Sequence, residues 1–313
     1  YLATRMTGSS RSRIQQALDG GYVFVGDKPV KSNYRIKPLD VVTLQLRRPK
    51  HELEIIPEPI PLDVVYEDEV LMVVNKPAGL VVHPGHGNYT GTLVNALAYY
   101  LQDDPLYDPA DPNVGLVHRI DKDTSGLLVI AKRPEAKAHL ARQFFNKTTR
   151  RTYRALVWGR LKEAEGTIIG NIGRDERDRL QMAVYPEGSP KGKHAVTHYT
   201  LLEELAYVSW VECRLETGRT HQIRAHMRHI GHPLFADTRY GGDKILWGNQ
   251  FSRYKQFVQN SLTLCPRQAP YAKTLGFVHP VTGQEMPSDS DLPCDLEQHL
   301  GRWRTDAAPV AND

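Results

Sequence analysis

The sequence predicts an α+β protein built on a mixed, mostly antiparallel central sheet flanked by helices. Segments typical of strands outnumber segments typical of helices, and several turns between them are short, which argues against a doubly wound parallel sheet. The length of 313 residues is enough for one large domain with a sizeable core and one small domain. The balance of 40% hydrophobic and 24% charged residues is that of a soluble globular protein.

The N-terminal segment, residues 1–48, predicts a helix followed by strands. Ser10 can cap a helix that runs to Asp19 and ends at Gly20-Gly21. Its expected inner face is Ile14, Ala17 and Leu18, and its outer face carries Arg11 and Arg13. Strands are expected over 22–25 and 41–46. Residues 49–61 contain four prolines among acidic groups and predict a semi-stiff linker.

The large domain is expected to span residues 62–305. A hairpin over 64–66 and 70–74 precedes two helices, and strands over 196–202 and 208–216 come later. The first helix runs from Thr92 to Leu101, and the face that we expect to be buried holds Leu93, Ala96, Leu97 and Tyr100. The second runs from Glu135 to Asn146 and buries Leu140 and Phe144. The last segment, 306–313, is rich in Ala and Pro and predicts a disordered tail.

Charge is segregated along the chain. Residues 1–50 hold 10 Lys and Arg against 3 Asp and Glu, although the whole chain has a net charge of only +4. Residues 132–160 form a second basic block that contains a single acidic residue, Glu135. Two basic blocks on an otherwise slightly acidic protein indicate a defined surface for a polyanion such as RNA. A solvated charged face is the alternative interpretation.

The cysteines and the apolar segments indicate a cytoplasmic protein without a membrane anchor. Three widely spaced cysteines form neither a disulfide framework nor a Cys-x-x-Cys metal pair, which fits a reducing compartment. No apolar run reaches the roughly 18 residues that span a bilayer. The chain starts at Tyr1 without a basic-then-apolar signal pattern.

One segment combines a polar turn with a buried strand. His118-Arg119-Ile120-Asp121 is followed by a turn that closes at Gly126, and the apolar run Leu127–Ala131 comes next. A strand of this kind would anchor the turn and present Asp121 from its entrance. Loops held by a rigid strand often carry binding and catalytic groups, but the same residue types also form ordinary turns. The spacing alone leaves both interpretations open.

The complete string from His118 to Gly126 resembles the signature of the RluA/RluD family of RNA pseudouridine synthases, with Ile120 where Leu is usual. Further strings are similar to the other motifs of this family, in the expected order: Asn75–Gly79, Arg151–Gly159, Leu215–Met227, and His232-Pro233-Leu234 with Tyr240–Gly242. Pro270-Tyr271 departs from the Leu-His that relatives usually carry. His83-Pro84-Gly85 and the N-terminal segment are most similar to the branch that modifies large-subunit ribosomal RNA.

The resemblance implies a pseudouridine synthase fold with a small N-terminal S4-like RNA-binding domain, whose first helix is shortened or missing and is expected to be mobile. It implies an isomerase that converts specific uridines to pseudouridine in 23S ribosomal RNA, as a monomer acting on RNA or pre-ribosomal particles without cofactor or metal. The implied catalytic residues are Asp121, Tyr153 and Arg224, with Arg224 as the charge partner of Asp121. The implied substrate-binding residues are Arg119, His118, Thr124, Arg219, His221, Asn75, Lys76 and His83.

The sequence also bears on other possible functions. The glycine spacing from Gly85 to Gly91 is one residue too long for a dinucleotide loop. The cluster His221, His226, His229 and His232 lacks a known zinc-ligand spacing. A transfer-RNA synthase of the same family and a non-catalytic ribosome-assembly factor remain alternatives. So does a glycosidase that pairs Asp121 with Asp123, although neighbouring turn positions seldom converge on one bond.

Overall fold

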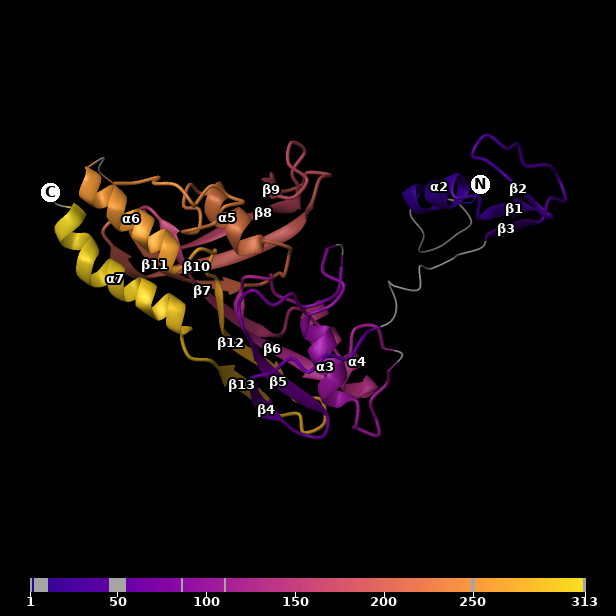
Figure 1. Cartoon of the computed structure of the whole chain (residues 1–313), viewed down its shortest axis with the longest axis horizontal. Helices are drawn as coiled ribbons and strands as arrows, with labels where there is room; N and C mark the ends of the chain where they lie inside the picture. Colours follow the sequence, from indigo (N-terminus) through magenta and orange to yellow (C-terminus); the bar gives the residue numbers. More distant parts are fainter. Residues whose placement is uncertain are drawn as a thin grey trace. The chain divides into compact units, whose positions relative to one another are not determined.

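The computed structural model describes residues 2, 11–44, 55–85, 87–109, 111–248 and 251–311 (Figure 1). The chain divides into two compact units, Tyr1–Glu54 and Ile55–Asp313. Several expectations fall outside the described residues: the Ser10 cap, the orientation of the Arg11 and Arg13 side chains, the start of the N-terminal unit, and most of the linker.

The N-terminal unit consists of one helix and a small antiparallel sheet. Helix α2 spans Arg11–Asp19, and the sheet has the order β2-β1-β3, with β1 at Val23–Val25, β2 at Lys28–Pro29 and β3 at Val42–Leu44. Ile14 and Val23 are buried between them. The expected helix and both strands are therefore present, and Lys28–Pro29 adds the short returning strand of a hairpin across the turn at Gly26.

The larger unit is built on a ten-stranded sheet. Its order is β4-β5-β6-β12-β7-β11-β10-β8-β9, and β13 pairs with β12. Every pairing is antiparallel except β6 with β12. This confirms the predicted mixed, mostly antiparallel sheet. The strands are β4 Val64–Glu67, β5 Leu71–Lys76, β6 Ser125–Ala131, β7 Arg150–Trp158, β8 Glu165–Arg174, β9 Met182–Tyr185, β10 Lys193–Leu205, β11 Val208–Leu215, β12 Tyr271–Val278 and β13 Glu285–Asp289.

Helices pack around this sheet (Figure 1). They are α3 Leu93–Leu101, α4 Pro134–Phe145, α5 Gln222–His229, α6 Ser252–Leu264 and α7 Cys294–Ala311. Thr92 caps α3 in a reciprocal capping box with Asn95, which fixes where this helix begins. Within the described ranges, no helix combines the length and the apolar character needed to cross a membrane.

Two expectations about helices differ from the structure. Tyr100 is 46% exposed because its hydroxyl donates a hydrogen bond to Glu67 at the surface, and Leu101 is buried in its place. The segment from Asp306, expected to be disordered, instead continues α7 to Ala311. Ala307 and Ala308 are strong helix formers that extend a helix already nucleated by packed residues such as Trp303.

Candidate active site

The site is built where the two parallel strands begin. Ser125 of β6 pairs with Tyr271 of β12, and Gly126 pairs with Ala272. Gly126 has a φ of +112°, and a Cβ added there would lie 2.3 Å from the Ala272 carbonyl oxygen, so the close approach of the strands requires glycine. Because parallel strands start at the same edge, the chain before β6 meets the chain before β12 there.

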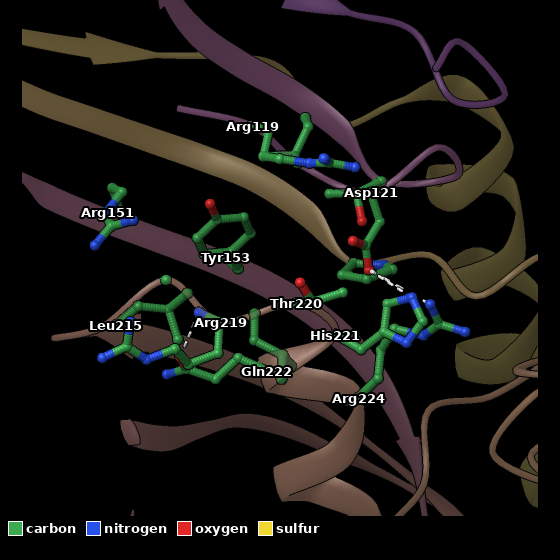
Figure 2. A pocket seen from close by; sticks show the side chains of 15 residues that line it. Arg119, Asp121, Arg151, Tyr153, Leu215, Arg219, Thr220, His221, Gln222 and Arg224 are labelled. Atoms are coloured by element: carbon green, nitrogen blue, oxygen red, sulfur yellow. Dashed lines mark hydrogen bonds and ion pairs between the residues drawn. The ribbon is translucent and has the colours of Figure 1, made fainter. Parts of the chain in front are cut away.

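A cavity of about 120 Å³ opens beside this edge (Figure 2). An apolar cavity of about 150 Å³ can hold benzene, so this one approaches the size of a single flat ring. Its lining comes from the loop before β6, from β7, from the end of β11 and the start of α5, and from the residue before β12. The lining residues are Arg119, Ile120, Asp121, Thr124, Arg151, Tyr153, Leu215, Gly218, Arg219, Thr220, His221, Gln222, Ile223, Arg224 and Pro270.

Asp121 and Arg224 meet in this cavity, as the sequence predicted for the pair. An Arg224 terminal nitrogen lies 3.4 Å from an Asp121 carboxylate oxygen, and the Asp121 side chain is 25% exposed. This contact is longer than an ordinary charge-assisted hydrogen bond, which is about 2.7–2.9 Å. Asp121 therefore lies beside the cation and keeps a face open to the cavity.

The main partner of Arg224 is Asp237, which the sequence analysis did not single out. The Nε and the other terminal nitrogen of Arg224 donate to the two oxygens of Asp237 at 2.7 and 2.9 Å. Asp237 is fully buried and also accepts hydrogen bonds from the backbone N–H groups of Arg239 and Tyr240. Burial disfavours the Arg224 charge, but Asp237 and then Asp121 outweigh it and raise the pKa of Arg224. The bidentate pair fixes the guanidinium and leaves one nitrogen directed at Asp121.

His221 lies on the other side of Asp121. Its φ of +55° turns the ring into the site at the start of α5, where a ring nitrogen forms a 2.9 Å hydrogen bond with the Tyr240 hydroxyl. The other ring nitrogen is 4.0 Å from an Asp121 oxygen. Burial lowers the pKa of His221 to about 4, although the Asp121 charge opposes this shift. At neutral pH the imidazole is uncharged and adds no second cation beside Asp121.

Tyr153 and apolar side chains form the wall of the cavity. Tyr153 is 8% exposed, and burial raises the pKa of its hydroxyl. Ile120, Leu215, Ile223 and Pro270 complete this wall. The unusual Pro270-Tyr271 pair keeps the wall apolar, because Pro270 faces the cavity while the Tyr271 hydroxyl bonds the Ser290 carbonyl elsewhere. A flat apolar wall beside one carboxylate suits a nucleobase attached to a sugar.

Of the eight residues expected to bind substrate, four line the cavity: Arg119, Thr124, Arg219 and His221. The other four do not, and each has a partner elsewhere. Asn75 donates to Asp63, His83 contacts the carbonyls of Pro84 and Pro112, and His118 accepts a hydrogen bond from the Val129 backbone. Lys76 is 1% exposed and donates to three carbonyl oxygens, of Pro77, Leu80 and Lys122.

Two cations hold the loop that carries Asp121. Lys76 Nζ donates to the Lys122 carbonyl at 2.9 Å, and Arg267 donates to the Asp123 carbonyl at 2.8 Å. Arg267 also pairs with Asp295 at the start of α7. Burial lowers the pKa of Lys76 to about 7, against the attraction of Asp123. These contacts restrict the loop backbone on both sides of Lys122 and so restrict where Asp121 can lie.

The histidines considered as a zinc cluster are separated by the fold. His221 faces the cavity, His226 bonds Thr197 inside the protein, and His232 bonds the Trp158 carbonyl. In the part of the chain that the structure describes, no group of three His, Cys, Asp or Glu side chains is arranged to hold a metal ion.

The chain was compared with known families and proteins. The family model of RNA pseudouridylate synthase matches residues 70–229, which include Asp121, Tyr153 and Arg224. The chain belongs to the RNA pseudouridylate synthase family. This confirms the resemblance on which the sequence analysis relied, and with it the prediction that the protein is a pseudouridine synthase.

Relatives of this pseudouridine synthase align over nearly all of its length. An uncharacterized RNA pseudouridine synthase of Chlorobaculum parvum is 46% identical over 97% of this chain and 93% of the relative. A protein of Neisseria meningitidis named ribosomal large subunit pseudouridine synthase D is 42% identical over 98% of this chain and 78% of the relative. The solved structure of human RNA pseudouridylate synthase domain containing 4 has a TM-score of 0.61 at 24% identity, covering 77% of this chain and 93% of that one. The last likeness supports the fold.

Proposed function

We propose that this protein converts uridine to pseudouridine in large-subunit ribosomal RNA, with Asp121 as the carboxylate that acts on the ribose. The observation that carries the proposal is the arrangement around Asp121. A buried Arg224–Asp237 pair directs one nitrogen at a partly open carboxylate, beside an apolar wall that contains Tyr153. Relatives named ribosomal large subunit pseudouridine synthase D, at about 42% identity over most of the chain, support the choice of RNA.

The reaction is an isomerisation, so the product has the same atomic composition as uridine. The bond between ribose C1′ and uracil N1 breaks and its electron pair leaves with N1. Asp121 either attacks C1′ and forms an ester or removes the proton from C2′. The detached base turns, C5 bonds to C1′, the C5 proton leaves and N1 gains a proton. If Asp121 formed the ester, its carboxylate is released, and if it took the C2′ proton, it returns that proton.

The described side chains supply what these steps need. Arg224 holds the Asp121 carboxylate in place, and neutral His221 packs beside it without adding a second positive charge. Tyr153 stacks on the uracil and assists the proton transfer at C5. The target must leave its stack to enter the cavity. Arg119 and Arg219, near the mouth, hold the flanking phosphates, and Thr124 closes the loop beside the ribose.

The N-terminal unit serves RNA binding rather than chemistry in this proposal. We assign residues 1–48 to an S4-like domain, 49–61 to the linker and 62–305 to the catalytic domain. The basic balance of residues 1–50 supports the assignment. We propose that the enzyme acts as a monomer on ribosomal RNA or its precursors. The three free cysteines, two buried and one exposed, suit a reducing cytoplasm.

Asp121→Asn tests the proposal, because it preserves the size of the side chain and removes its charge. The variant should fold and bind RNA, but tritium release from C5-labelled uridine in ribosomal RNA should fall to background. Asp123→Asn is the matched control from the same turn and should retain most of the activity. Mapping pseudouridines in RNA from cells that lack the gene then identifies the RNA. Turnover by a folded Asp121→Asn protein, or loss of sites only from transfer RNA, would contradict the respective part of the proposal.

A further inference from the structure

Arg151 is a buried arginine for which the described part of the chain provides no carboxylate partner. Its side chain is part of the cavity lining and the residue is 8% exposed. Its Nε is enclosed without a hydrogen-bond partner, and within the described residues its guanidinium makes no hydrogen bond or ion pair. Two other arginines near the site are paired with carboxylates, Arg224 with Asp237 and Arg267 with Asp295.

The surroundings shape a place for this cation without neutralising it. The guanidinium lies over the Phe144 ring, 5.4 Å from its centroid. A Cβ added at Gly218 would lie 3.0 Å from an Arg151 terminal nitrogen, so glycine leaves room for the group. Phe144 also stacks on His118, whose pKa is lowered to about 3 by burial and by the Arg151 charge. His118 therefore stays neutral beside the cation.

Burying part of a guanidinium without a polar partner is unfavourable, and arginine does not escape by losing its proton. Features that lower the stability of the free protein are expected at functional sites, where a bound ligand can supply the missing interaction partner. The guanidinium can therefore gain an acceptor from whatever enters the cavity. The cavity is small enough for a single ring, and Arg151 lies deeper than Arg119, which is exposed and better placed for a phosphate.

Tyr153 lies between Arg151 and Asp121 in the cavity (Figure 2). Both charges act on its hydroxyl, since after burial the Arg151 charge lowers its pKa and the Asp121 charge raises it. A uracil that stacks on Tyr153 with its ribose at Asp121 would therefore direct its far edge toward Arg151. In uracil, the ring atom opposite N1 is C4, which carries O4.

We propose that Arg151 is a further catalytic residue that binds the uracil carbonyl opposite the ribose and stabilises the detached base as an anion. The inference rests on the proposed function. When the bond from C1′ to N1 breaks, the electron pair stays with the base and its charge spreads over N1, O2 and O4. A buried guanidinium fixed near these oxygens stabilises that charge more strongly than water does.

The same residue also explains how the base can turn without leaving. Rotation about the axis through N3 and C6 exchanges N1 with C5 and O4 with O2. The atom opposite C5 is C2, so the carbonyl that faces Arg151 is O4 before the turn and O2 after it. One fixed donor therefore meets an equivalent acceptor in both positions, while the apolar wall imposes no preference between them.

The test compares Arg151→Met on RNA with uridine and RNA with 5-fluorouridine at the target position, measuring consumption of the target nucleotide in single turnovers. Loss of a donor to a developing anion lowers the rate by about 10²–10³-fold. We expect this loss with uridine, little change in the RNA concentration for half-saturation, and a clearly smaller loss with 5-fluorouridine. Fluorine stabilises the uracil anion itself, so the reaction depends less on Arg151.

Arg304→Met is the control, because Arg304 is a surface arginine of α7 that pairs with Glu203 at 2.7 Å and is not among the residues that line the cavity. It should leave the maximal rate nearly unchanged with both RNAs. Guanidinium ion added to Arg151→Ala should restore part of its rate. Arg151→Gln provides the comparison if the methionine variant does not fold.

Two results would overturn the inference. One is a maximal rate of Arg151→Met close to that of the wild type. The other is a defect that appears only in RNA binding and is equal for both RNAs, as expected for a phosphate contact. Wild-type protein and Asp121→Asn run beside these variants separate the two claims. Normal wild-type turnover with an unaffected Arg151→Met refutes the role of Arg151 alone, whereas a wild type that forms no pseudouridine refutes the proposed function and this inference together.

Discussion

Removing Asp237 should destabilise the protein more than removing Asp121, although Asp121 is the residue to which we assign the chemistry. Asp237 is fully buried and accepts four hydrogen bonds, two from Arg224 at 2.7 and 2.9 Å and two from backbone N–H groups at 3.1 and 3.2 Å. Asp237→Ala leaves the Arg224 charge buried without this partner, which typically costs about 3–5 kcal/mol. Asp121→Ala removes one 3.4 Å contact from a partly exposed side chain, worth about 1 kcal/mol or less.

A double variant separates the stability of this pair from its role in catalysis. Arg224→Met alone should also cost about 3–5 kcal/mol, because it leaves the Asp237 carboxylate buried without its cation. Arg224→Met combined with Asp237→Leu removes both charges and fills the space with apolar groups, so it should be more stable than either single variant. It should remain inactive, because no cation is left beside Asp121.

Urea unfolding followed by circular dichroism gives the free energy of unfolding of each variant, and tritium release gives the activity. A domain with a total stability of about 5–15 kcal/mol can tolerate such losses at low temperature. If the double variant loses the sum of the two single losses, Arg224 and Asp237 are not coupled. If Asp237→Ala is as stable and active as the wild type, the argument from the buried pair is refuted.

Two further predictions concern pH and the N-terminal unit. Among the described residues, burial lowers the pKa of four histidines below the unfolded value of about 6.5, to about 3 for His118 and about 4 for His221, His226 and His299. Their contribution to stability is therefore complete above pH 6.5 and is lost as the pH falls toward 4. Each contributes up to about 1.4 kcal/mol per pH unit. His226→Gln should flatten this loss in unfolding measured from pH 7 to 4.5, and an unchanged slope would count against the assignment. A protein that starts at Ile55 should fold and keep some turnover on a minimal stem-loop, with a weaker salt dependence of RNA binding, and an unfolded or inactive product would contradict the proposed division of the chain.

Much of the fold could be predicted because apolar runs of strand length mark the sheet. Leu127–Ala131 was expected to be a core strand, and it lies within the fully buried β6. The prediction that Tyr100 is buried was wrong. Periodicity assigns a side chain to a face of its helix, but it cannot show that the tyrosine hydroxyl donates a hydrogen bond to Glu67 at the surface. The prediction of a disordered tail from Asp306 was wrong because the alanines there extend a helix that tertiary contacts have already formed, and those contacts cannot be read from the sequence.

The site residues that lie in recognisable motifs could be predicted from the sequence. The other site residues are brought together by contacts between segments far apart in the chain, which the sequence does not reveal. The approach of Asp121 to Arg224 was expected, but Asp237 was missed although it directly follows the apolar run Leu234–Ala236. A carboxylate after such a run is a signal for burial, and a buried carboxylate requires a cation. The family resemblance implies Lys76 as a substrate-binding residue, but the structure buries its side chain against carbonyl oxygens. Its three carbonyl partners come from segments that the sequence alone does not bring together.

The single parallel pairing in the sheet has a consequence for the order in which the protein matures. Arg267 donates a hydrogen bond to the Asp123 carbonyl, 144 residues earlier in the sequence, and β12 begins four residues after Arg267. During synthesis from the N-terminus, the Asp121 loop and the Tyr153 strand emerge long before Arg267, Pro270 and β12. Contacts so distant in sequence form late, because the intervening chain must first be ordered. The cavity can therefore be completed only after the chain has been made beyond Pro270 and β12, which delays the earliest possible turnover well past the synthesis of Asp121 and Tyr153.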